Sequence, residues 1–276
     1  PCLSRPIRLL RSGRDCGNDR RKREKMEERL NKWLSRMGVC SRREADRLIE
    51  AGKVLVDNRP ASMGQKVTPG QKVVCNGRMV RVDKSRKPRP VLLAVNKPRG
   101  IVCTTTDKDR AENIVDFLGY PERIYPVGRL DKDSEGLLLM TNQGDLVNKI
   151  MRSGNAHEKE YIVTIDKPVT EHFLEQMAGG IRLPELDQVT RPCKVKKVER
   201  NTFSIILTQG LNRQIRRMCE VCGCQVRRLV RVRIMNIRLG NLRTGAYRQI
   251  TKEEYEELTG LLKDSSSLSL KERKNR

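Results

Sequence analysis

Residues 126–142 read PVGRLDKDSEGLLLMTN, a charged loop that runs directly into an apolar segment. The apolar part, residues 137–141, has the length and composition of a buried β-strand. A functional site needs rigidly held side chains, and a loop at the mouth of a core strand provides them. On the residues alone, each carboxylate is a candidate nucleophile, a candidate base or a solvated loop charge. The charged residues are Arg129, Asp131, Lys132, Asp133 and Glu135.

The segments around this stretch predict one larger domain, at residues 91–262. Strands and helices do not alternate regularly, which favours a mixed or antiparallel sheet with flanking helices, an α+β fold. Hydrophobic periodicity predicts strands over residues 91–96, 137–141, 160–165 and 202–207, and helices over about 145–152, 170–178 and 214–221.

A smaller αβ module is predicted at residues 27–83. Apolar residues at helical spacing begin at Leu30, and Gly38 ends that run. Ser41 followed by Glu44 predicts a capping box at the start of a second helix, which ends at Gly52. Short strands follow, over residues 53–57, 72–75 and 79–82.

The charge of the chain points to nucleic acid. Lys and Arg number 58 against 34 Asp and Glu, a net charge of +24. Residues 1–25 carry nine basic and three acidic side chains and residues 264–276 four and two, so the segment between them retains +16. The commonest partner of so basic a folded segment is a phosphate backbone. We expect disordered basic extensions at 1–26 and 263–276, a natural start at Met26, and a proline-containing linker at 84–90.

Several other classes of protein are disfavoured. The chain shows no secretory signal and no apolar run of membrane-spanning length, so its nine cysteines are expected to be reduced thiols in the cytoplasm. Cys219, Cys222 and Cys224 cluster without a second pair of metal ligands, and no metal is expected. Neither a Walker loop nor a Gly-x-Gly-x-x-Gly motif is present.

The smaller module carries a recognisable set of residues: Arg29-Leu30, Gly38, Ser41-Arg42-Arg43, Ala45, Leu48-Ile49, Gly52 and Val-Val-Cys-Asn-Gly at 73–77. This set resembles the S4-type RNA-binding domain. The resemblance implies that both helices lie against an RNA backbone. The expected contacts are Lys32, Arg36, Arg42, Arg43 and Arg47.

Four motifs follow in the larger domain: Asn-Lys-Pro at 96–98, Gly-Arg-Leu-Asp-Lys-Asp-Ser-Glu-Gly-Leu-Leu at 128–138, Lys-Glu-Tyr at 159–161 and Arg-Gln-Ile-Arg-Arg-Met at 213–218. With the S4-type module they resemble, over residues 27–257, the pseudouridine synthases of the RsuA family, nearest its ribosomal large-subunit synthase F (RluF) branch. The resemblance implies that Asp131 is the catalytic aspartate, Tyr161 the aromatic that packs on the target base, and Arg216 the basic partner of Asp131. It places Leu229 and Arg129 at the substrate pocket and gives Asp133 and Glu135 no chemical role.

The implied reaction suits these residues. Uridine becomes pseudouridine when the N1–C1′ bond breaks, the uracil rotates and C5 bonds to C1′, so no atom is gained and no cofactor is needed. One ionised carboxylate near the ribose can act as nucleophile or as a base at C2′ that leads to a glycal. A neighbouring arginine favours its ionised form, and the base must be flipped out of the RNA.

RNA is the expected partner, and the chain is expected to be a monomer. The branch implies a uridine in a 23S rRNA loop near the peptidyl-transferase centre, with the anticodon of tyrosine tRNA as a second or alternative target. Phosphate contacts are expected from Arg213, Arg217, Arg227, Arg228, Arg231 and Arg233. Two rival interpretations are a non-catalytic rRNA-binding or assembly protein and a metal-dependent nuclease that uses Asp131, Asp133 and a third carboxylate.

Overall fold

A computed structural model describes residues 27–80, 89–104 and 112–265, and the chain divides into two compact units, Pro1–Pro88 and Arg89–Arg276. The division falls inside the predicted linker at 84–90. The extension at 1–26, most of that linker, the end of the strand predicted at 79–82 and most of the tail at 263–276 lie outside the described residues. The domain boundaries drawn from the sequence stay predictions.

Residues 27–80 of the N-terminal unit form two helices and small antiparallel sheets. Helix α2 (Leu30–Arg36) and helix α3 (Arg42–Glu50) bury Leu30, Leu34, Ala45 and Ile49 in one apolar cluster. The Ser41 hydroxyl accepts the Glu44 N–H at 3.1 Å, which is one of the two bonds of the predicted capping box, whereas the Glu44 carboxylate pairs with Arg47. One sheet has the order β3 (Arg59–Pro60), β2 (Val54–Val56), β5 (Val73–Cys75) and β6 (Arg78–Met79), and a second pairs β1 (Glu28–Arg29) with β4 (Lys66–Val67).

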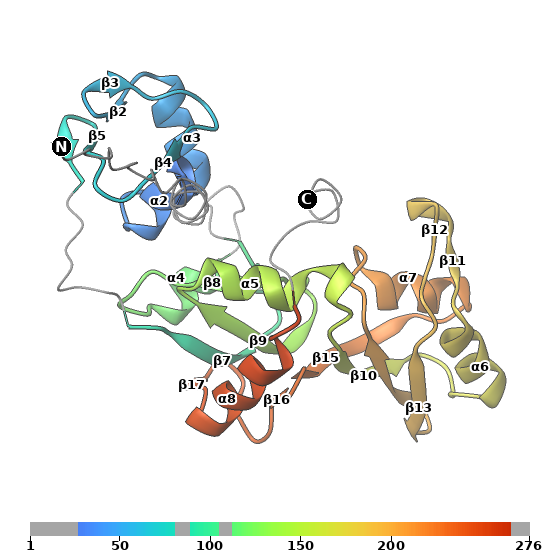
Figure 1. Ribbon diagram of the computed structural model, residues 1–276. Coiled ribbons are helices and arrows are strands. Elements are labelled where there is room, and N and C mark those ends of the chain that lie inside the picture. Colours follow the sequence, from blue (N-terminus) through green and yellow to red (C-terminus); the bar gives the residue numbers. More distant parts are fainter. Residues whose placement is uncertain (1–26, 81–88, 105–111, 266–276) are drawn as a thin grey trace, which may run out of the picture. The chain divides into compact units, whose positions relative to one another are not determined.

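The C-terminal unit is organised on a nine-stranded mixed sheet (Figure 1). The β15–β9 pair is parallel, whereas the other strand pairs of this sheet are antiparallel, which confirms the predicted sheet type. The main order is β13 (Lys194–Glu199), β14 (Thr202–Leu207), β10 (Lys159–Ile165), β15 (Val226–Ile234), β9 (Glu135–Thr141), β7 (Leu92–Lys97) and β17 (Tyr247–Gln249). Off this path, β16 (Ile237–Arg238) pairs with β15 and β8 (Tyr125–Val127) with β9. A separate hairpin joins β11 (Arg182–Leu183) to β12 (Gln188–Val189).

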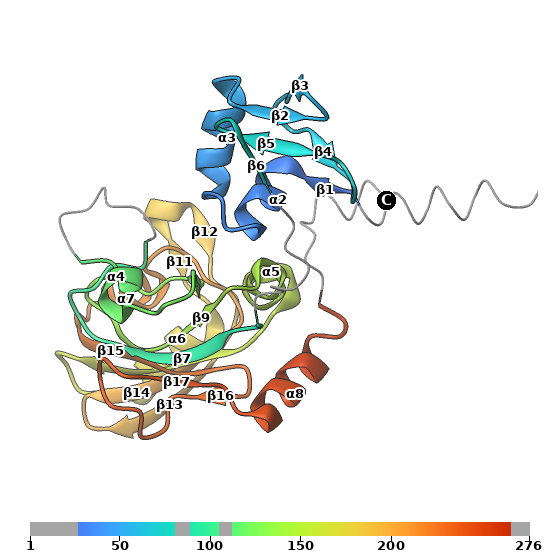
Figure 2. The same ribbon diagram turned by 90° about the vertical axis from the view of Figure 1, so that its left-hand side faces the viewer.

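Helices cover both faces of this sheet. Strand β7 alternates between two clusters: Leu93 and Val95 pack with Ile114 of α4, and Leu92 and Ala94 belong to the cluster that includes α5 and α8. Figures 1 and 2 show α4 and α7 on one side of the sheet and α8 on the other. The helices are α4 (Ile114–Leu118), α5 (Gly144–Met151), α6 (Glu171–Gly179), α7 (Gln214–Val221) and α8 (Lys252–Leu261), with short 3-10 turns at Ser153–Asn155 and Pro184–Leu186.

The predicted helices and strands of this unit agree with the structure to within one or two residues. Strands β13 and β15 were not predicted, because lysines and arginines interrupt the apolar alternation by which a half-buried strand is recognised. Strand β15 is nevertheless central, and it lies beside β9, the strand that follows the charged loop.

Candidate active site

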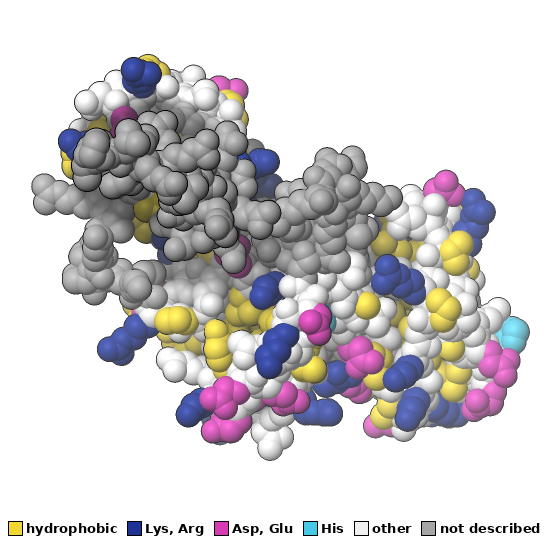
Figure 3. Space-filling model, in the orientation of Figure 1, with side chains coloured by type: hydrophobic (Ala, Val, Ile, Leu, Met, Phe, Trp, Pro, Cys, Tyr) yellow, Lys and Arg dark blue, Asp and Glu magenta, His cyan; other side chains and the backbone are white. Residues whose placement is uncertain are grey.

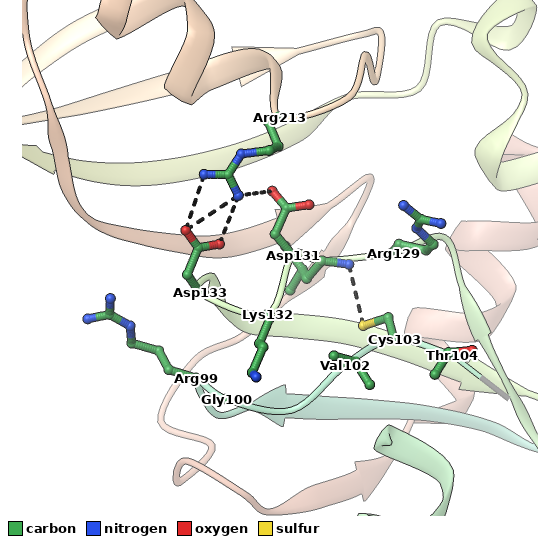
Figure 4. A pocket seen from close by; sticks show the side chains of 11 residues that line it. Arg99, Gly100, Val102, Cys103, Thr104, Arg129, Asp131, Lys132, Asp133 and Arg213 are labelled. Carbon is green, nitrogen blue, oxygen red and sulfur yellow. Dashed lines mark hydrogen bonds and ion pairs between the residues drawn. The ribbon is translucent and has the colours of Figure 1, made fainter. Parts of the chain in front are cut away.

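A pocket of about 750 Å³ opens at the charged loop before β9 (Figure 4). The loop and the turn that follows β7 form its walls, and Arg213 approaches from the start of α7. Its charged lining residues are Arg99, Arg129, Asp131, Lys132, Asp133 and Arg213. Residues 129–133 of the charged loop therefore line a concave site.

Hydrogen bonds from the β7 turn hold the loop in place. Lys97 is fully buried, and its Nζ donates to the carbonyl oxygens of Pro98 and Ser134, both at 2.8 Å. The Gly100 N–H donates to the Lys132 carbonyl at 2.8 Å, and Gly100 has φ +91°, a conformation that other residues rarely adopt. These bonds tie the charged loop to the end of β7 and to the turn that follows it, and so limit the motion of the loop.

Strand β9 begins in close contact with β15. Gly136 has φ +101°, and a Cβ at this position would lie 2.8 Å from the Arg231 backbone nitrogen and would also meet the Arg231 carbonyl oxygen. A side chain at residue 136 would push β9 away from β15, and with it the loop that carries Asp131. Gly136 is therefore required for this approach of the two strands.

The arginine nearest to Asp131 is not the one that was expected. Arg213 Nη1 lies 3.9 Å from Asp131 Oδ2 and 3.3 Å from Asp133 Oδ1. Arg216 Nη2 lies 3.2 Å from Asp133 Oδ2 and donates to the Asp133 carbonyl at 3.0 Å. The expected direct pair between Arg216 and Asp131 is thus corrected, because the turn of the loop brings Asp133 against the buried face of α7.

The charges of the site fix the state of Asp133. Burial opposes ionisation, but the hydrogen bonds from Arg213 and the positive charge of Arg216 outweigh it and hold the pKa of the Asp133 carboxyl below its ordinary value. Burial lowers the pKa of the Arg216 guanidinium, and Asp133 opposes that effect. Asp133 thus has a structural role as the anion that accompanies a buried guanidinium, which the sequence did not show.

Tyr161 and Leu229 lie on two adjacent central strands of the sheet, β10 and β15. Tyr161 on β10 is half-buried and packs against two apolar clusters, one of which contains Leu130. Leu229 on β15 is buried in the other cluster and pairs with Val163. Neither side chain lines the pocket as it stands, whereas Arg129 does.

The basic residues predicted on the S4-type module fall into two groups. Arg42 and Arg43 are exposed, and within the described residues neither has a carboxylate partner. The other three are engaged by acidic neighbours: Lys32 and Arg36 with Glu28 at 3.7 and 2.8 Å, and Arg47 with Glu44 at 2.5 Å.

Several arginines predicted to bind phosphate on the larger domain are also occupied. Arg217 pairs with Glu185, Arg228 with Glu135, and Arg233 with both Glu158 and Glu160. On the face drawn in Figure 3, basic groups of this domain are interspersed with acidic groups and do not gather in one patch. Arg227 is exposed and has no ion pair within the part of the chain that is described.

The prediction that Arg231 contacts phosphate is wrong for this structure. Its residue exposure is 1%, and its Nε donates to the Leu137 carbonyl at 2.7 Å, so the guanidinium faces the interior between β15 and β9. Nearby Lys159 is also buried, and burial together with the charge of Arg231 lowers the pKa of its amine to about 8. No sequence pattern indicated these two buried cations, because strand alternation alone does not say which face of the sheet is covered.

Potential metal ligands are dispersed among the described residues, where no three His, Cys, Asp or Glu side chains group together. The described cysteines are free thiols. None of the helices within the described ranges is long and apolar enough to cross a membrane.

The family model "S4 domain" matches residues 28–73, in the N-terminal unit, and "RNA pseudouridylate synthase" matches residues 91–221, in the C-terminal unit. The two units are therefore the RNA-binding module and the catalytic module of an RNA-modifying enzyme. The chain belongs to the RsuA family of pseudouridine synthases that carry an S4 domain, as the resemblance implied, and it converts uridine to pseudouridine in RNA. The rival interpretations as an assembly protein or a nuclease are therefore set aside.

Curated relatives and a solved structure cover most of the chain. The dual-specificity RNA pseudouridine synthase RluF of Escherichia coli (strain K12) is 52% identical over 239 residues, 87% of this chain and 81% of that protein. The ribosomal large subunit pseudouridine synthase B of Bacillus subtilis (strain 168) is 36% identical over 242 residues, 85% of this chain and 96% of that protein. A crystal structure of a pseudouridylate synthase superposes with a TM-score of 0.61 at 27% identity, covering 83% of this chain and 99% of that one.

Proposed function

We propose that Asp131 is the carboxylate that acts on the ribose of a flipped-out uridine. The observation that carries this proposal is its position: Asp131 lines the pocket on a loop that hydrogen bonds tie to β7, with Arg213 3.9 Å away. The neighbouring carboxylate, Asp133, is engaged by Arg216, which leaves Asp131 as the acid that faces the pocket with the weaker ion pair.

The chemistry asked of Asp131 is to assist loss of uracil from C1′ and its return through C5. As a nucleophile it forms an ester with C1′ while N1 takes the bonding electrons. As a base it removes the C2′ proton and a glycal forms. In the ester route, attack of C5 on C1′ expels the carboxylate, and in the glycal route C2′ regains its proton from the carboxyl group as C5 bonds to C1′. In both routes the C5 proton is then lost and N1 ends protonated, so the product is an isomer of the substrate.

The neighbouring residues would position the substrate. Arg129 lines the pocket and is exposed, so it can contact the extruded nucleotide or its phosphate. Tyr161 and Leu229 would form the apolar side on which the uracil packs, after an adjustment that opens the pocket toward β10. Arg216 would act through Asp133 and the loop, and Arg213 would be the direct partner of Asp131.

The proposed substrate is ribosomal RNA of the large subunit, at a uridine in a 23S rRNA loop near the peptidyl-transferase centre. The anticodon of tyrosine tRNA is a second or alternative target. Support comes from the names of the relatives, one a dual-specificity enzyme and the other a ribosomal large-subunit enzyme. We further propose that the protein acts as a monomer in the cytoplasm, where its RNA substrates and the free thiols of the described cysteines are both expected.

Pseudouridine mapping tests the substrate. Total RNA is compared from cells that have the gene, cells that lack it, and cells that carry the Asp131→Asn variant. We expect one or a few sites in 23S rRNA or tyrosine tRNA to lose pseudouridine in both the deletion and the variant. Unchanged modification in the variant would refute the role of Asp131, and sites confined to other RNAs would refute the proposed substrate.

A further inference from the structure

The pocket contains more positive charge than its carboxylates neutralise. Four cationic side chains line it, Arg99, Arg129, Lys132 and Arg213, against the two carboxylates Asp131 and Asp133. Arg213 is shared between those carboxylates, and Asp133 also pairs with Arg216. Positive charge without a counter-ion in a concave site attracts an anion.

Three of these cations are exposed and have no ion pair in the described ranges: Arg99, Arg129 and Lys132. Figure 4 shows Arg99 beside Asp133 and Arg129 beyond Asp131, so the two arginines lie on opposite sides of the carboxylates. A strand that places one nucleotide in the pocket leaves its flanking phosphates outside, one on each side.

Arg99 is also held in a fixed place relative to the catalytic loop. It lies between Pro98, whose carbonyl accepts the Lys97 amine, and Gly100, whose N–H is bonded to the Lys132 carbonyl. A cation on a restrained turn loses less freedom when it binds a phosphate than one on a loose loop. Burial lowers the pKa of the Arg216 guanidinium, and the positive charge of Arg99 adds to this effect, so Arg99 lies within electrostatic range of Arg216.

We propose that Arg99 binds an RNA backbone phosphate that flanks the target uridine, on the side of the pocket opposite Arg129. This inference rests on the proposed function of the pocket and adds a residue that positions the strand. The ligand is a phosphodiester, because an exposed guanidinium without a carboxylate partner matches its oxygens in a bidentate manner. Arg99 is a positioning residue, since it does not touch the reacting atoms.

The test measures binding of the full-length protein to a stem-loop that carries the mapped uridine, over a range of salt concentrations. The Arg99→Gln variant is compared with Arg99→Lys and with Arg200→Gln, which removes an exposed charge that does not line the pocket. We expect Arg99→Gln to weaken binding about tenfold and to reduce the slope of log K against log salt by about 0.7 to 0.9. Arg99→Lys should keep the slope, and Arg200→Gln should match the wild type.

Neutral phosphates locate the contact. The same stem-loop is made with a methylphosphonate at the phosphate on the 5′ side or on the 3′ side of the uridine. For one of these RNAs the wild type should lose affinity about tenfold while Arg99→Gln loses nothing further. An unchanged salt slope in Arg99→Gln would overturn the proposal. So would a variant that loses further affinity with each of the two methylphosphonate RNAs, because its missing contact would then be to neither phosphate. These experiments measure binding alone. Failure of the proposed function would be detected separately, because RNA treated with the wild-type protein would then contain no pseudouridine.

Discussion

The guanidinium of Arg216 pairs with Asp133 and not with Asp131: its Nη2 lies 3.2 Å from Asp133 Oδ2 and also donates to the Asp133 carbonyl. The side chain of Arg216 is 9% exposed, whereas that of Asp133 is 39% exposed. A buried guanidinium therefore pairs with a more exposed carboxylate that lines the pocket. Asp133 and Arg216 hold the loop, and Asp131 lies outside this pair, which is consistent with the role that we propose for it on the ribose.

The two carboxylates should therefore respond differently to the same substitution. Asp131→Asn should reduce pseudouridine formation at least about a thousandfold while RNA affinity and unfolding free energy stay near the wild type, because it removes the reacting group from a half-buried position. Asp133→Asn should keep measurable activity and lose about 1 kcal/mol of stability. Product formation, RNA titration and urea unfolding measure the three quantities. Equal activity losses in both variants, with equal stability losses, would remove the distinction.

Arg216 should matter for stability as much as for activity. Its guanidinium bonds the Asp133 carbonyl at 3.0 Å and the Val226 carbonyl at 3.3 Å, which joins the loop, α7 and the start of β15. Arg216→Ala should cost about 2 to 4 kcal/mol of unfolding free energy and most of the activity. Arg216→Lys should restore the charge but not this geometry, and so recover only part of either loss. Thermal or urea unfolding measures the stability of both variants. A purely catalytic role for Arg216 would leave their unfolding free energy equal to that of the wild type.

Lys159 gives a stability effect that depends on pH. Its amine has a pKa of about 8 in the folded protein against 10.5 ordinarily, so between these values the unfolded chain binds more protons and stability rises with pH. Below pH 8 the buried charge is a cost, and Lys159→Met should stabilise the protein there by about 1 to 3 kcal/mol. The gain should shrink as pH rises toward 10. Urea unfolding at several pH values checks this, and a gain independent of pH would contradict it.

Salt dependence should separate free arginines from paired ones. Replacing both Arg42 and Arg43 by Gln should lower the slope of log K against log salt by about one to two, because each is exposed and unpaired within the described residues. Arg233→Gln, the matched control, removes a guanidinium held by Glu158 and Glu160 and should leave the slope unchanged. RNA titrations at several salt concentrations provide the slopes. If the slope of the wild type itself were flat, the basic surface would not be the RNA-binding face.

The local features of this protein were largely readable from its residues. Helical spacing after Leu30, the cap at Ser41 and the apolar run at 137–141 each depend on neighbours close in the chain, and the structure contains the expected elements at those places. The order of the charged loop and the arginine-rich helix start also indicated the family and pointed to Asp131, because those motifs are contiguous stretches.

The partners of the charged side chains were decided only by the tertiary structure. Arg227 and Arg231 stand four residues apart on β15, yet the first is exposed and the second is 1% exposed beside the Leu137 carbonyl. Arg216 meets Asp133 across 83 residues of sequence. Strand register, the register shifts between β10 and β15 and the turn of the loop determine these contacts. They arise from packing between distant segments, which no local pattern encodes.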